Sequence, residues 1–130
     1  SNTYFKNRTM KNTENEMLIA VEYVIDYDGF ESLIVTALEG GINYWANIED
    51  GSYKKINDWS EANKKGHEPF SVRFAQYIWS GEISLESIKN GWQLFSHNRK
   101  HFGDFLDNKT DAITADVWFQ CCSLGDVVYG

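Results

Sequence analysis

Two histidines four residues apart, His97 and His101, are the first candidates for chemistry in this sequence. On a helix, side chains at this spacing share one face, so both imidazoles could bind one zinc ion. The residues between them are Asn98-Arg99-Lys100, which lack the glutamate of a zinc protease and place two cations beside the site. His67 is the only other histidine. We therefore expect surface histidines, and neither a metal nor another cofactor.

Nucleophilic catalysis has little support either. Cys121 and Cys122 are adjacent, so they cannot form an ordinary structural disulfide with each other, and they lie in an apolar run. The sequence predicts that they are small buried hydrophobic residues in a reducing cytosol. It contains no Gly-x-Ser-x-Gly elbow, no Walker loop and no dinucleotide fingerprint. We expect a protein that is not an enzyme.

The segment Leu38-Glu39-Gly40-Gly41-Ile42-Asn43-Tyr44-Trp45 joins a helical pattern to a strand-like one. If a helix ends here and a strand begins within two residues, Gly40 or Gly41, or both, should have φ > 0. Alternatively, exposed glycine N–H groups and the two aromatic rings could form a pocket for a small nucleotide-like signalling molecule. The residues predicted for that ligand site are Glu39, Gly40, Gly41, Asn43, Tyr44, Trp45 and Arg73. The residue pattern leaves open whether this segment is a site or a structural joint.

The charge distribution favours a different kind of site. The net charge is −7, and no Lys or Arg occurs between Asn12 and Tyr53, a window with nine acids. This window argues against direct nucleic-acid binding, because phosphates need basic partners. It suits the basic surface of a partner protein, although a solvated acidic face would have the same composition. The residues predicted for partner binding are Glu22, Asp26, Asp28, Glu31, Glu49 and Asp50.

The helices that position these residues have clear signatures. Apolar residues from Phe30 to Leu38 follow the 3.6-residue period of an amphipathic helix. Ser84 is a suitable N-cap for a second helix that buries Leu85, Ile88, Trp92 and Phe95. A short helix or turn is expected over His101–Asp107. Thr110 or Asp111 caps a final helix, and Gly125 ends it. One face of this helix has Ile113, Val117, Cys121 and Leu124. Because its other sides are apolar too, we expect the helix at the centre of the core.

Alternating patterns predict the strands. The predicted strands are Met17–Ile25, Ile42–Ile48, Tyr53–Ile56 and Phe70–Ala75, with a short β-like end at Asp126–Gly130. A hairpin-type turn at Glu49–Ser52 connects the second strand to the third. Helices and strands without regular alternation indicate an α+β fold, with a small antiparallel or mixed sheet packed against about three helices. We expect a flexible arm over residues 1–16 and one compact domain over residues 17–130. No apolar run spans a membrane and no signal peptide is evident, so we expect a cytoplasmic protein.

Both ends of this domain resemble a family of small, largely uncharacterised proteins encoded by phages and prophages of low-GC bacteria. Those proteins carry an Ala-x-Glu-Gly-Gly-x-x-Tyr-Trp-like segment, as in Leu38–Trp45 here. They end in an acidic-capped helix before Gly-Asp/Glu-Val/Ile-Val-Tyr-Gly, matched here by Asp111, Asp116, Gln120 and Gly125–Gly130.

The resemblance covers most of residues 30–130, although residues 57–79 match loosely and Cys121–Leu124 replaces an apolar stretch that contains Phe. It implies a phage accessory protein that acts in the cytoplasm of a bacterial host and inhibits a host protein, such as one of anti-phage defence. It carries over no catalytic residue. The oligomeric state stays open.

Overall fold

The computed structural model of the protein describes residues 17, 19, 22–49, 51, 54, 58, 61, 76–77 and 81–130. The predicted arm over residues 1–16 and the predicted strand Phe70–Ala75 lie outside these residues, as do Asp50, His67 and Arg73.

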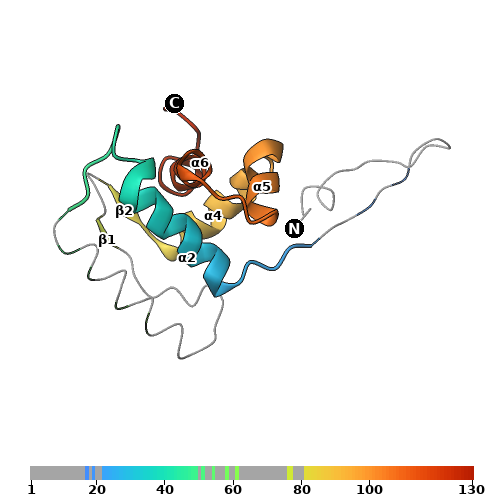
Figure 1. The fold of residues 1–130 in the computed structure, drawn as a ribbon, viewed down its shortest axis with the longest axis horizontal. Helices are drawn as coiled ribbons and strands as arrows, with labels where there is room; N and C mark the ends of the chain where they lie inside the picture. Colours follow the sequence, from blue (N-terminus) through green and yellow to red (C-terminus); the bar gives the residue numbers. More distant parts are fainter. Residues whose placement is uncertain are drawn as a thin grey trace.

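The described part of the chain is a mostly helical small domain. Its helices are α2 (Tyr27–Thr36) with the π-helical turn η1 (Ala37–Gly41), α4 (Leu85–Phe95), α5 (Arg99–Leu106) and α6 (Ala112–Ser123). In Figure 1, α6 lies among α2, α4 and α5, and it contacts all three. The strands β1 (Gln76–Tyr77) and β2 (Glu82–Ile83) form only a two-residue antiparallel pair, with Gln76 opposite Ile83. The predicted α+β class, with a sheet packed against helices, is therefore wrong.

The predicted strand Ile42–Ile48 is a turn followed by irregular chain. The backbone N–H groups of Trp45 and Ala46 donate to the carbonyl oxygen of Ile42 at 3.0 and 2.9 Å. Ile42 and Ala46 are buried at a helical spacing, and this spacing coincides with an alternating pattern over so few residues. Residues 22–25 of the predicted first strand also have no regular structure, and the predicted β-like end at Asp126–Gly130 forms no strand. Of the strand predicted at Tyr53–Ile56 the structure describes only Lys54, which is helical and pairs with Asp58 at 2.8 Å, so the prediction is wrong at this residue.

The predicted helix from Phe30 to Leu38 is confirmed. Asp26 caps α2 by accepting the Gly29 N–H at 2.9 Å. The predicted apolar stripe is wholly buried, at Phe30, Leu33, Ile34, Ala37 and Leu38. The helix continues into η1, where the N–H of Ile42 donates to the carbonyl of Ala37 at 3.1 Å, five residues back.

The glycine pair at the end of η1 has a different role from the predicted one. The glycines with positive φ among the described residues are Gly51, Gly125 and Gly130, so the left-handed joint predicted at Gly40-Gly41 is wrong. Gly41 is instead a point of close contact between segments. A Cβ there would lie 2.8 Å from the carbonyl oxygen of Ala112, at the start of α6, whereas a Cβ on Gly40 would meet nothing within 4 Å.

The predicted caps of the later helices are confirmed. Ser84 and Ser87 satisfy each other's backbone N–H groups at the start of α4. Asp111 accepts the N–H of Thr114 at 2.8 Å, and this hydrogen bond is the main cause that lowers the pKa of Asp111. Gly125, with φ of 72°, follows the end of α6 as predicted.

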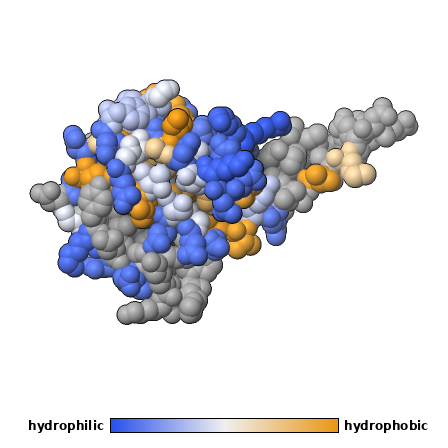
Figure 2. Space-filling model, in the orientation of Figure 1, coloured by the Kyte–Doolittle hydropathy of each residue, from blue (hydrophilic) through white to orange (hydrophobic). Residues whose placement is uncertain are grey.

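Helix α6 is the core element, as predicted. Every residue from 114 to 122 is buried, including Trp118 and Phe119, which are fully buried. The predicted face was wrong at its two ends, because Ile113 and Leu124 are exposed while Val117 and Cys121 are buried. Figure 2 shows hydrophilic residues over much of one face of the molecule, with the apolar residues there in separate patches.

Helices α4 and α6 approach each other closely at Gly91. A Cβ built on Gly91 would lie 2.5 Å from the Cα of Cys122 and 2.7 Å from its backbone nitrogen. Contact with backbone atoms cannot be relieved by rotating a side chain. The two helix axes are therefore held at a distance that only glycine permits.

We expect Gly91→Ala to destabilise the protein by about 1–3 kcal/mol, because the helices must separate to admit the methyl group. Gly103→Ala is the matched control. Gly103 also lies inside a helix, α5, but a Cβ there meets nothing within 4 Å, so this change should stabilise by about 0.5–1 kcal/mol. Urea unfolding of the two variants measures both effects. Equal stabilities of the two variants would contradict the close contact.

Candidate functional site

A carboxylate on α6, that of Asp116, is the centre of the most extensive polar network in the described structure. Asp116 is buried, and three side chains donate to it. The Tyr44 hydroxyl reaches Oδ2 at 2.5 Å, and Trp45 Nε1 and Gln120 Nε2 reach Oδ1 at 2.8 and 2.9 Å. A carboxylate accepts hydrogen bonds only, so three donors suit it well.

Gln120, one turn after Asp116 on α6, connects this network to the final segment. Its Oε1 accepts the backbone N–H groups of Val128 and Tyr129 at 2.8 and 2.9 Å, and its Nε2 also donates to the Tyr129 carbonyl at 3.2 Å. The Tyr129 ring stacks on Trp45, with centroids 5.0 Å apart and planes at 15°. The segments Leu38–Trp45 and Gly125–Gly130, far apart in the sequence, therefore meet on α6.

The surroundings of Tyr44 change its acidity. Burial of the hydroxyl and, next, its hydrogen bond to Asp116 raise the pKa of Tyr44 to about 12, although 59% of the residue is exposed. Both causes favour the protonated phenol, which is the form that donates to Asp116.

The residues predicted for a nucleotide-like ligand lie partly in this network. Glu39, Gly40 and Asn43 are exposed, and Gly41 is buried against α6. Trp45 is half-buried, with its indole N–H on Asp116 and its ring between Tyr129 and Phe119. The indole N–H of Trp45 and the ring face that stacks on Tyr129 are thus both in contact with other residues of the chain.

The acidic residues predicted for partner binding gather around the start of α2. Glu22, Asp26 and Asp28 are exposed there, and Glu31 is half-buried one turn further on. Glu49 is exposed on the segment that follows the turn after η1.

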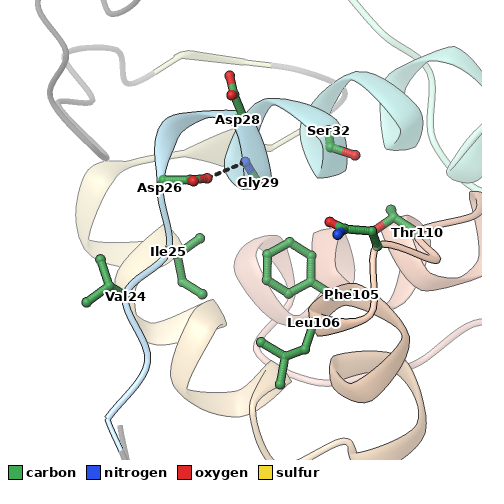
Figure 3. A pocket seen from close by; sticks show the side chains of 10 residues that line it. Val24, Ile25, Asp26, Asp28, Gly29, Ser32, Phe105, Leu106 and Thr110 are labelled. Carbon is green, nitrogen blue, oxygen red and sulfur yellow. Dashed lines mark hydrogen bonds between the residues drawn. The ribbon is translucent and has the colours of Figure 1, made fainter.

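Asp26 and Asp28 lie beside a cleft of about 550 Å³ between the start of α2 and the α5–α6 loop. Figure 3 shows Phe105 between these two elements, with Thr110 on one side and Asp26 and Gly29 on the other. Gly29 makes room for this ring, since a Cβ there would lie 3.0 Å from Phe105 Cζ. The ten residues that line the cleft include two acids and no Lys, Arg or His, namely Val24, Ile25, Asp26, Asp28, Gly29, Ser32, Phe105, Leu106, Asn108 and Thr110.

The part of the cleft that comes from α5 and its loop is not among the residues predicted from the sequence. Asn108 has φ of 58°, and the N–H of Lys109 reaches back to the Asp104 carbonyl at 2.7 Å, which closes the end of α5. An asparagine just after an apolar helical stretch is a recognisable stop signal. No pattern in the sequence, however, indicates that this stop lies beside the start of α2.

The histidines do not share a helix face. His97 lies in the turn between α4 and α5, whereas His101 belongs to α5 and its Nδ1 lies 3.0 Å from Thr114 Oγ1 on α6. The shared-face geometry considered for zinc is therefore wrong. Among the residues that the structure describes, no group of three or more His, Cys, Asp or Glu side chains could hold a metal ion.

The cysteines are buried, as predicted. Burial and, next, the Asp126 carboxylate raise the pKa of Cys121 to about 11, and burial raises the pKa of Cys122 well above its ordinary value. Both thiols are therefore protonated at neutral pH, and a protonated thiol is a poor nucleophile.

No protein family, no curated protein and no solved structure matches this chain. Each helix in the described part is too short or too polar to span a lipid bilayer.

We expect Tyr44→Phe to destabilise the protein by about 1–2 kcal/mol at pH 7, because Asp116 loses a hydrogen-bond donor. Tyr44 is partly exposed, so water can replace some of the lost interaction. The folded-state pKa of Tyr44 lies above its ordinary value of 10.0, so its contribution is complete below pH 10 and is lost as pH rises toward 12. The stability difference between parent and variant should shrink over that range. Urea unfolding at pH 9, 10, 11 and 12 measures it, and a constant difference would contradict the assignment.

Proposed function

We propose that this chain is a non-enzymatic accessory protein of the phage type, which binds and inhibits a host protein in the bacterial cytoplasm. The binding surface is the acidic one around the start of α2, comprising Glu22, Asp26, Asp28 and Glu31. The observation that carries the proposal is the cleft beside Asp26 and Asp28, whose described lining combines two acids with apolar and neutral polar side chains and contains no Lys, Arg or His.

The chemistry of this cleft suits the side chain of an arginine or lysine. The methylene groups of such a side chain can pack on Phe105 and Leu106, while its cationic end meets the carboxylates at the rim. An aromatic ring also attracts a cation placed over its face. The base-free window in the sequence supports the same kind of partner, because no neighbouring cation in residues 12–53 opposes it.

The acids in this surface are not equivalent. Asp26 accepts the Gly29 N–H and so holds the start of α2, whereas Asp28 is exposed in the first turn and points away from the cleft centre in Figure 3. Replacing Asp26 by lysine would remove a cap as well as a charge. Asp26→Asn keeps a side chain that can cap the helix and removes the charge alone.

The alternative is a protein that sequesters a nucleotide-like molecule at Glu39, Gly40, Gly41, Asn43, Tyr44 and Trp45. We rank it second, because Trp45 already stacks on Tyr129 and its N–H already donates to Asp116. Native mass spectrometry of the purified protein distinguishes the two proposals. A co-purified molecule of nucleotide mass that is lost in Asn43→Ala would favour the alternative.

We expect the double variant Asp26→Asn/Asp28→Lys to lose capture of its partner from a lysate of a low-GC bacterium. The parent's capture should weaken as salt rises, because exposed charges are screened within about 8 Å at physiological ionic strength. With the captured partner purified, the variant should associate more slowly, with a smaller change in dissociation. Pull-down at two salt concentrations, followed by surface plasmon resonance, measures both effects.

Glu86→Lys is the matched control. Glu86 occupies the first turn of α4 as Asp28 occupies the first turn of α2, so both reversals disturb a helix start in the same way. The control should capture the partner like the parent. Equal capture by the control and the double variant, or capture that does not depend on salt, would contradict the proposal.

A further inference from the structure

We propose that Trp45, Asp116 and Gln120 form a peptide-recognition site, which the chain's own residues Gly125–Gly130 occupy. In their place it accepts a segment of a partner protein whose backbone bends as residues 128–129 do and which carries an aromatic side chain. This inference does not depend on the acidic cleft, which is lined by other residues.

Gln120 recognises the backbone of its occupant. Its amide accepts the Tyr129 N–H at 2.9 Å and donates to the carbonyl of the same residue at 3.2 Å, as a neighbouring strand would, and it also accepts the Val128 N–H at 2.8 Å. Adjacent N–H groups point to opposite sides of an extended chain, so two of them on one oxygen mean that the backbone bends at Val128. The contact with Gln120 therefore recognises this backbone conformation and requires no particular side chain.

The aromatic ring at position 129 supplies the selectivity. It stacks on Trp45 with centroids 5.0 Å apart, whereas the side chains of Val127 and Val128 make little use of the surface. These two valines are 42% and 62% exposed. Three backbone hydrogen bonds to Gln120 and one aromatic stack on Trp45 thus hold the occupant, and its valine side chains bury little apolar surface.

The receptor side has hydrogen bonds of its own that do not involve the occupant. Asp116 accepts both Gln120 Nε2 at 2.9 Å and Trp45 Nε1 at 2.8 Å. Phe119 packs against the Trp45 ring at 6.0 Å. Groups that such contacts already orient lose less freedom on binding, so the site can exchange one segment of this conformation for another.

The test uses the full chain carrying Tyr129→Ala, which weakens the internal occupant, and a fluorescein-labelled peptide Gly-Asp-Val-Val-Tyr-Gly. Fluorescence anisotropy should show saturable binding to this variant. The parent should bind the same peptide at least about tenfold more weakly, because its own segment competes at a high effective concentration.

Two altered peptides serve as controls that cannot affect folding. A peptide methylated on the tyrosine nitrogen removes the donor to Gln120 and should bind about three- to tenfold more weakly. A peptide with alanine for tyrosine removes the stack and should bind about tenfold more weakly.

Three results would overturn the proposal. One is no saturable binding to a Tyr129→Ala variant whose circular dichroism and cooperative melting match the parent. Another is equal binding of all three peptides. The third is loss of folding in Tyr129→Ala, because a segment required for folding is a structural strap and not a replaceable occupant.

Discussion

The buried carboxylate of Asp116 is the constraint on which much of this structure depends. A charge taken out of water is tolerated only where hydrogen-bond donors replace its hydration. Two of the three donors come from adjacent residues, Tyr44 and Trp45, which both reach this one group. In a strand, neighbouring side chains point to opposite faces of the sheet. The need to satisfy Asp116 therefore explains why the segment after η1 turns, despite an alternating sequence that favours a strand.

The glycines at two contacts allow α6 to lie among its neighbours. Gly41 brings the end of η1 against the carbonyl of Ala112, and Gly91 brings α4 against the backbone of Cys122. A side chain at either position would push the two elements apart. At Gly41 it would also meet the backbone nitrogen of Asp116, so this glycine affects the polar network as well as the packing.

The sequence predicts the helices well because their signals are local. The apolar stripe from Phe30 to Leu38 and the caps at Ser84 and Asp111 each lie within one or two turns. The fold class was wrong because alternation over four to seven residues does not separate a strand from a turn with two buried positions. For the candidate sites, Asp26 and Asp28 were identified from charge alone. The partners of these acids across the cleft, and the meeting of Tyr44 with Asp116 over 72 residues of sequence, depend on tertiary packing that no local pattern records.

The burial of α6 on all sides has a consequence for how the chain folds. Helices α2 and α4 each present an apolar face whose main partner is α6, so neither has a completed core before α6 docks. Bringing α6 against α2 closes a loop of many residues, and this closure costs entropy before apolar burial can offset it. Folding is therefore slower than in a bundle whose contacts are local. A chain caught before that step exposes two apolar helix faces at once and is a natural substrate for chaperones and proteases. The docking of α6 therefore covers both apolar faces in one step, and the stability of the native state depends on it.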